Sequence, residues 1–355
     1  MEELTILKNT SYLILYGGVI MLSVVAALYL LLRRGNAIAP EVTSPVRLRR
    51  WAAAFLTVCA MSHLFWIIYI FHPSHTNYVI VCVLDIVLLI PSIAGIMLSM
   101  LQDRRRPIWP VWPMLIPAVV LSVLSIIRGD KALFPAIAIY IVSLYALLVV
   151  YMFFGVRDYG RWLRDNYADM EHKEVWQSML VLAGFLLFFV MYSCTTEGNL
   201  VLVFLFQIDC IIIIALLLWR VETLQQLSEN TPPSASAPPA IPASIGPLLK
   251  KRCEDGQLYL QHDLTLAQLA QIIGTNRYYL SQHFAQQGLT YNAYINGLRV
   301  RHFIKLYQKA VASQRIVTAQ QLAFESGFHS YSTFSATFKQ NMGTTVTAWI
   351  RSTKK

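Results

Sequence analysis

Apolar residues fall into seven long runs within the first 220 residues of the chain, and these runs dominate its pattern of hydrophobic and polar positions. Each run is about 18 to 24 residues long, enough for an α-helix to cross the roughly 30 Å hydrocarbon layer of a bilayer. Soluble proteins seldom contain seven such helices in succession. The pattern therefore predicts membrane spans at residues 11–32, 52–71, 78–101, 109–127, 133–154, 176–193 and 199–219.

Lysine and arginine are unevenly distributed over the connections between these runs. The first, third and fifth connections carry twelve in total, whereas the N-terminal tail and the other three connections carry three. Basic connections remain on the cytoplasmic side of a membrane. The sequence thus predicts an N-terminus outside and everything after residue 219 in the cytoplasm. The outer connections, about five or six residues each, leave no room for an outer domain, so a signal must enter through the bilayer, a cavity among the helices or a partner membrane protein.

Four polar side chains interrupt the apolar runs, namely His63, Asp85, Gln207 and Asp209. A carboxylate at the centre of a bilayer costs about 2.5–3.5 kcal/mol on insertion scales, so these side chains should face other helices rather than lipid. Their depths along the spans would let them share one buried polar cluster. Two interpretations remain open. Either they join the helices through hydrogen bonds, or they line a cavity in which a small ligand or a proton changes helix packing.

The composition changes sharply after the last run. Residues 228–247 contain six prolines among serine and alanine, a mixture that forms neither a helix nor a packed core. The pattern therefore predicts a membrane domain at 1–220, a helix end and proline-rich linker at 221–247, and a separate domain at 248–355. Apolar positions at 217, 221 and 224 continue a helical stripe beyond the last span, either as a fraying helix end or as a short dimer contact.

Two stretches of the last domain repeat one another. Residues 265–284 read TLAQLAQIIGTNRYYLSQHF, and residues 318–338 read TAQQLAFESGFHSYSTFSATF. Each copy has a threonine at a helix start, a short helix with Leu-Ala, a glycine at the turn and a second amphipathic helix. This order is typical of a helix-turn-helix unit. A helix over 291–309 should join the two units as a rod of roughly 27 Å, so that their second helices reach adjacent major grooves, roughly 34 Å apart on one face of the duplex.

The charge of this domain favours the same interpretation. Residues 248–355 carry 13 Lys and Arg against four Asp and Glu, which accounts for nearly all of the net charge of +10. A basic helical domain suits the phosphate backbone of duplex DNA. Basic charge alone would equally suit an anionic lipid surface, and the repeated unit makes DNA the better interpretation.

Residues 248–355 resemble the AraC-type DNA-binding domain, in which two helix-turn-helix units are joined by a linker helix. The second unit carries Leu322-Ala323, Gly327-Phe328, Ser330, Phe334, Phe338-Lys339 and Gly343, and the first carries LTLAQLA, Gly274, LSQHF and the later YINGLR. Three positions differ from the usual pattern of the family, namely Ala336, Val346 and Ile350. Together with the seven apolar runs, this resemblance predicts an all-α chain: a seven-transmembrane-helix bundle followed by a cytosolic tandem helix-turn-helix domain. The combination predicts a membrane-bound one-component transcription regulator of the bacterial cytoplasmic (inner) membrane.

Candidate DNA-binding residues lie on the second helix of each unit, off the Leu and Phe stripe that forms its core face. They are Asn276, Arg277, Tyr278, Ser281 and Gln282 in the first unit and Ser330, Tyr331, Ser332, Ser335 and Lys339 in the second. By resemblance, positions 278 and 282 should contact bases. A bidentate Gln–adenine contact discriminates by about 1–3 kcal/mol, so the first unit should provide more of the specificity. Asn276 and Ser330 equally suit helix N-caps.

The sequence offers little support for other classes of protein. The sequence has no glycine-rich phosphate loop, no Ser/His/Asp order and no Cys/His cluster at zinc spacing, so we expect neither an enzyme nor a metal or other cofactor. The alternative class is a membrane transporter or channel with a regulatory DNA-binding tail, which substrate flux in proteoliposomes would reveal. The expected partners are double-stranded DNA and the lipid bilayer. Contact with RNA polymerase, a homodimer and an unknown membrane signal or partner remain open.

Overall fold

The computed structural model describes residues 9–33, 35–193, 200–227 and 245–353, and over these ranges it is helical without any β-sheet. The chain divides into two compact units. Unit 1 comprises Met1–Tyr159 and Val175–Leu227, and unit 2 comprises Gly160–Glu174 and Ser228–Lys355. Each unit is all-α, as the sequence predicts.

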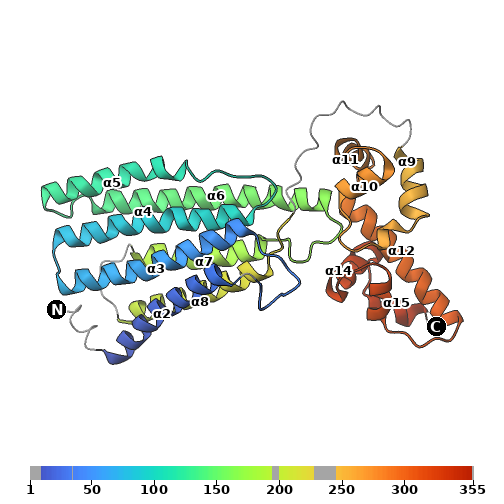
Figure 1. The fold of residues 1–355 in the computed structure, drawn as a ribbon, viewed down its shortest axis with the longest axis horizontal. Coiled ribbons are helices and arrows are strands. Elements are labelled where there is room, and N and C mark those ends of the chain that lie inside the picture. The colour runs from blue at the N-terminus through green and yellow to red at the C-terminus, as the bar shows by residue number, and fades with distance from the viewer. Residues whose placement is uncertain (1–8, 34, 194–199, 228–244, 354–355) are drawn as a thin grey trace. The chain divides into compact units, whose positions relative to one another are not determined.

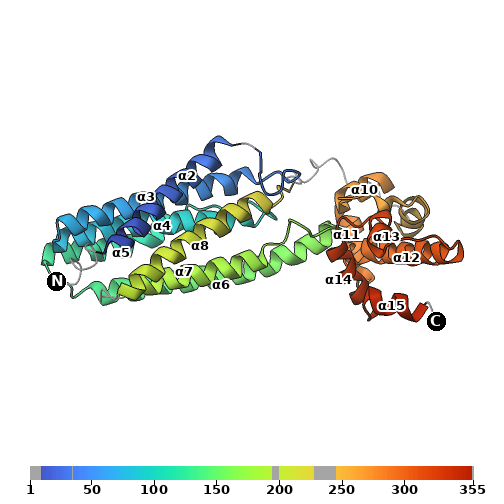
Figure 2. The same ribbon diagram turned by 90° about the horizontal axis from the view of Figure 1, so that it is seen from below.

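Unit 1 is a bundle of long helices that run alongside one another (Figures 1 and 2). Its elements are α2 (Thr10–Leu32), α3 (Val46–Phe71), α4 (His75–Met100), α5 (Val111–Arg128), the greater part of α6 (Phe134–Asn166), α7 (Trp176–Ser193) and α8 (Leu200–Thr223). Among the residues searched, six helices are long and apolar enough to cross a membrane, namely α2, α3, α4, α5, α6 and α8. The seventh predicted span coincides with α7, an 18-residue helix, and its crossing stays a prediction.

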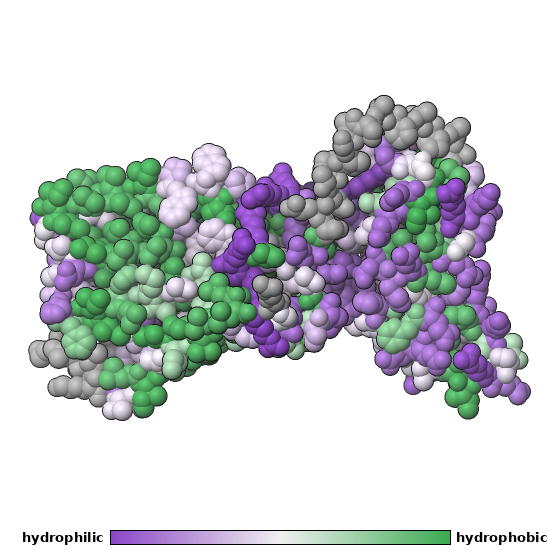
Figure 3. All heavy atoms as spheres, in the orientation of Figure 1, coloured by the Kyte–Doolittle hydropathy of each residue, from purple (hydrophilic) through white to green (hydrophobic). Residues whose placement is uncertain are grey.

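The surface of unit 1 is largely hydrophobic. Hydrophobic residues cover most of the bundle in the space-filling view (Figure 3). Ile127 is 75% exposed and Ile139 is 68% exposed. Exposing such side chains to water raises the free energy by roughly 25 cal/mol per Å² of apolar surface, so an exterior of this kind is more stable in hydrocarbon than in water. Trp109 and Trp219, which we place at the membrane interface, are also exposed.

The residues that follow the last apolar helix are packed against unit 1. Helix α8 ends at Thr223, and Leu224 and Leu227 are buried. The backbone N–H of Leu227 donates to Oε1 of Gln102 at 2.9 Å, while Gln102 Nε2 donates to the Gln225 carbonyl at 2.9 Å. The helical stripe expected to pass through residue 224 therefore stops one residue earlier, because these polar contacts hold residues 224–227 in a non-helical turn.

Unit 2 contains two small helical lobes joined by one long helix. Lobe 1 has α10 (Leu266–Ile273) and α11 (Arg277–Gln286), and lobe 2 has α13 (Ala319–Glu325), α14 (Tyr331–Met342) and α15 (Val346–Thr353). Helix α12 (Tyr291–Ala312) contributes to the cores of both lobes. The short elements α9 (Ile245–Leu248), η1 (Leu249–Glu254) and η2 (Leu258–Leu260) pack at the beginning of the unit.

A segment from the middle of the chain belongs to unit 2. Residues 160–174, the last turns of α6 and the connection toward α7, group with the two lobes. Ala168 of this segment is 1% exposed and lies in the core of lobe 1. The sequence predicts these residues only as part of a connection between two spans, because one small apolar residue carries no signal of a distant contact. The expected boundary at residue 220 likewise lies inside α8, and unit 1 continues to Leu227.

Candidate nucleic-acid interface

The first helix-turn-helix unit is defined by polar caps and a glycine turn. Thr265 and Gln268 form a reciprocal capping box at the start of α10, in which each side chain bonds the backbone of the other. Gly274 ends that helix with φ of 82°, a left-handed conformation that glycine adopts without strain. Asn276 then caps α11, since its Oδ1 accepts from the N–H of Tyr279 at 2.9 Å. These caps fix where each helix begins and hence which side chains point outward.

The second unit repeats this construction. Thr318 caps α13 through the N–H of Gln321 at 3.1 Å, and Ser330 caps α14 through the N–H of Thr333 at 3.2 Å. The turn between the helices contains Gly327, with φ of 88°. A Cβ at this position would also lie 2.9 Å from the backbone of Leu260. The turn thus needs glycine for its conformation and for a close approach of two backbones.

The cores of the two lobes contain the residues expected from the sequence. Lobe 1 buries Leu266, Leu269, Ala270, Leu280 and Phe284, each at most 2% exposed. In lobe 2 the corresponding residues are Leu322, Ala323, Phe334 and Phe338. Trp349 of α15 caps lobe 2, because its ring lies 5.2 Å from that of Tyr307 and 5.5 Å from that of Phe338.

Helix α12 has 22 residues, which corresponds to a rod of about 33 Å. This is three residues longer than the predicted helix and still matches the spacing of successive major grooves on one face of B-DNA, roughly 34 Å. The cap of the helix is Thr290, whose Oγ1 accepts from the N–H of Ala293. A rod of this length lets the two lobes engage one face of a duplex.

The buried side chain of Arg299 in α12 contacts both lobes. Its side chain is only 1% exposed and donates to the carbonyls of Tyr259 at 2.8 Å and Gln261 at 2.9 Å. The guanidinium also lies over the ring of Phe328, 5.8 Å from its centroid. Burial lowers the pKa of Arg299, and the nearby carboxylates of Asp169 and Asp263 act in the opposite direction. In the sequence this arginine is recognisable only as part of the YINGLR motif, and the motif does not predict its contacts with both lobes.

The candidate base-reading residues of α11 lie on one outward side of the helix. Tyr278 is 70% exposed, and Gln282 is exposed one turn further along. Ser281 is half-buried beside them, as is Arg277 at the first position of the helix. Burial lowers the pKa of Arg277, and the nearby Tyr167 acts in the opposite direction. The arrangement leaves Tyr278 and Gln282 free to reach base edges.

The candidates of α14 are arranged in a similar way, with one difference. Ser332 and Lys339 are exposed, and Ser335 is half-buried. Tyr331, however, packs against the core of lobe 2, with its ring 5.7 Å from that of Phe334. The outward face of α14 consists mainly of short side chains, which gives lobe 2 fewer groups for discriminating bases.

In unit 1, three of the four polar candidates, His63, Asp85 and Gln207, lie close together. His63 Nε2 lies 3.2 Å from Oε1 of Gln207. Asp85 accepts a hydrogen bond from Nε1 of Trp66 at 2.8 Å, and it is near enough to His63 for an electrostatic interaction. Asp209 is 5% exposed, and its Oδ2 has no hydrogen-bond partner among the described residues. Three of the four candidates thus lie close together, while Asp209 shows no contact with them.

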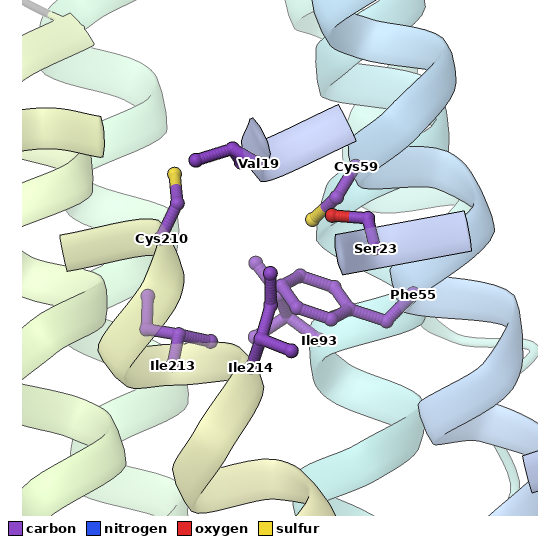
Figure 4. Close-up of a pocket in the computed structure, with 8 residues that line it drawn as sticks. All are labelled: Val19, Ser23, Phe55, Cys59, Ile93, Cys210, Ile213 and Ile214. Carbon is purple, nitrogen blue, oxygen red and sulfur yellow. The ribbon is translucent and has the colours of Figure 1, made fainter. Parts of the chain in front are cut away.

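The same bundle contains a small cavity (Figure 4). Its volume is about 20 Å³, which is room for about one water molecule. It is lined by Val19, Ser23, Phe55, Cys59, Ile93, Cys210, Ile213 and Ile214. None of the four polar candidates lines this cavity, so it gives no support to a ligand site among them. No group of three or more His, Cys, Asp and Glu side chains is arranged to hold a metal in the part of the chain that the structure describes.

Two helix-turn-helix units on one rigid linker helix define a DNA-binding domain of the kind found in transcription regulators. Residues 269–352 match the family model described as a helix-turn-helix domain, which is of the AraC type. Neither the comparison with curated proteins nor that with solved structures gave a match. The chain therefore combines an AraC-type DNA-binding domain with helices that could cross a membrane, six of them among the residues that the structure describes.

Proposed function

We propose that the chain is a membrane-bound one-component transcription regulator whose two helix-turn-helix units occupy adjacent major grooves of one duplex. The observation that carries this proposal is the pair of capped, outward-facing helices α11 and α14 on the linker helix α12. The net basic charge of residues 248–355 supports it as well. In this proposal the DNA-binding domain at residues 248–355 lies in the cytoplasm of a bacterial cell, and the apolar helices hold it at the inner membrane.

The ten candidate side chains have different roles in this proposal. Gln282 and Tyr278 read base edges, while Arg277 and Lys339 bind phosphates. Ser281, Ser332 and Ser335 make short polar contacts, and Tyr331 supports the surface of lobe 2 from its core. Asn276 and Ser330 act chiefly as caps that orient the two helices, because their side-chain oxygens already accept a backbone N–H.

The proposal also includes control of DNA binding by a signal that the apolar helices receive in the membrane. A single span would suffice to anchor a protein, and this chain has at least six candidates. The buried Asp209 and the linked pair of His63 and Gln207 are the polar groups through which a proton or small ligand could change helix packing. RNA polymerase and a second copy of the chain are the further partners that a regulator of this class would use.

Binding of duplex DNA by the intact protein tests this proposal. The chain, purified in lipid nanodiscs, should bind a fluorescent duplex more weakly as salt increases, because several lysines and arginines displace counterions from the phosphates. Fragments selected from genomic DNA by the nanodiscs should share a sequence motif with two halves about one helical turn apart. Absence of duplex binding at low salt would rule out the proposed function.

A further inference from the structure

The connection at residues 160–174 is built into lobe 1 rather than lying on its surface. The backbone of Tyr167 forms an antiparallel bridge with that of Thr265. The carbonyl of Ala168 accepts hydrogen bonds from Nδ2 of Asn292 at 2.7 Å and of Asn296 at 3.0 Å. The methyl group of Ala168 lies in the lobe 1 core. Each contact joins two segments more than 90 residues apart in the sequence, and together they fix the connection in one register.

Charged groups of the connection have partners in the docked position. Lys173 is 4% exposed at its side chain, and its Nζ lies 3.3 Å from Oδ1 of Asp263. Asp169 is 4% exposed and lies near the buried guanidinium of Arg299. Buried charges are unfavourable unless a partner compensates them. The two pairs therefore offset the cost of burying Lys173 and Asp169 in the docked connection.

The docked connection covers the end of lobe 1 at which α10 begins. Thr265, its bridge partner, is the N-cap of α10, the first helix of the helix-turn-helix unit. In such units the first helix crosses the DNA backbone, and helix N-termini bind phosphates. Tyr167 also lies near Arg277, the candidate phosphate contact at the start of α11. Tyr278 and Gln282 remain exposed. The connection thus occupies the phosphate-binding end of lobe 1 and not its base-reading side chains.

We propose that residues 160–174 act as an autoinhibitory segment that competes with the DNA backbone for the N-terminal end of α10 and for Arg277. The proposal rests on the function proposed above, because it presumes that lobe 1 binds duplex DNA. The segment contains four acidic residues against three basic ones, so it repels the phosphates that it displaces. It is also continuous with the apolar helices α6 and α7, so a change in their packing would release or seat it without using the proline-rich linker.

Releasing the segment is the first arm of the test. Ala168→Glu places a carboxylate in the lobe 1 core and leaves every residue of 248–355 unchanged, while Ala168→Ser keeps a small side chain and serves as the control. In nanodiscs the Glu variant should bind cognate and random duplexes about tenfold more tightly than the wild type, the effect of one recovered charge-assisted hydrogen bond to phosphate. The dependence of affinity on salt should become steeper by about 0.9 for each additional phosphate that the released protein neutralises. The Ser variant should match the wild type.

Locking the segment is the second arm. Residues paired across an antiparallel bridge lie about 4.5–5.5 Å apart at their Cα atoms, which suits a disulfide. The double variant Tyr167→Cys/Thr265→Cys should therefore bind DNA more weakly when oxidised than when reduced, whereas Thr265→Cys alone should not respond to oxidation. Equal DNA affinity of the released, locked and wild-type proteins would overturn the autoinhibition, as would weaker binding by the released form. Failure of all of them to bind duplex at low salt would instead overturn the proposed function.

Discussion

Gln282 and Lys339 project from the two recognition helices, and their chemistry predicts different losses on truncation. Gln282→Ala removes a side chain that can form two hydrogen bonds with adenine, which should cost about 1–3 kcal/mol on the cognate site and little on random DNA. Lys339→Ala removes a charge, so affinity for both duplexes should fall by the same factor and the salt slope should decrease by about 1. Fluorescence anisotropy with the intact protein at several salt concentrations measures both effects.

Gln286 offers a matched control for this comparison. It is the same residue type at the exposed C-terminal end of the same helix, so Gln286→Ala should leave the ratio of cognate to random affinity unchanged. An equal loss of this ratio at positions 282 and 286 would mean that α11 does not present Gln282 to bases. The assignment of specificity to the first unit would then be wrong.

The turn glycines of the two units differ in what surrounds them. A Cβ on Gly274 would meet no atom within 4 Å, whereas one on Gly327 would lie 2.9 Å from the Leu260 backbone. Both residues have positive φ. Gly274→Ala should therefore cost about 1 kcal/mol from backbone strain alone. Gly327→Ala should cost the same strain plus about 1–3 kcal/mol from the steric clash with Leu260. The temperature at which the variants in nanodiscs lose duplex binding should fall more for position 327; equal falls would contradict the close approach to Leu260.

At the scale of elements, the sequence predicts those features that depend on local chemistry. Thr265, Asn276, Thr318 and Ser330 are N-caps because each is a small polar residue directly before an amphipathic stretch. The core faces followed in the same way from i,i+4 spacing. The contacts of Ala168 could not be predicted, since a single alanine in a polar connection has no periodicity and its partners lie more than 90 residues away.

The orientation of the apolar helices is a prediction of the charge pattern, and fusions to a reporter that is active only in the cytoplasm test it. Fusions after Arg106, Arg164 and Leu227 should be active, and one after His75 should be inactive, because basic connections are retained inside. Leu227 is chosen because the buried turn after α8 remains complete there.

The same fusions decide whether α7 crosses the membrane. A fusion after Glu197 should be inactive if α7 is a seventh span. Activity at both 164 and 197 would leave α7 on one side of the membrane. Activity at His75 with none at Arg106 would place the DNA-binding domain outside the cell and contradict the proposed function.

At the scale of the whole molecule, the question is whether the apolar helices sense a signal or only anchor the DNA-binding domain. Asp85 and Asp209 distinguish the two cases because they lie in different surroundings. Asp85 accepts a hydrogen bond from Trp66, whereas Oδ2 of Asp209 has no partner among the described atoms. A buried carboxylate without a partner is costly when charged, so a proton on Asp209 would change the energy of the bundle more than the exchange of one hydrogen bond.

Single substitutions by asparagine test sensing, since Asn keeps the shape and an acceptor but removes the charge. In Asp209→Asn, a promoter that the protein binds should be expressed at one fixed level, while the abundance of the protein stays normal. Asp85→Asn should have a smaller effect. Asp130→Asn is the control, because Asp130 lies outside the spans, where its side chain is 45% exposed and faces Arg128. If Asp209 acts through the connection at 160–174, Asp209→Asn should have no further effect on expression in a protein that already carries Ala168→Glu. The reason is that a released segment can no longer be seated on lobe 1. Unchanged expression in both Asn variants would leave Asp85 and Asp209 as packing residues and the apolar helices as an anchor.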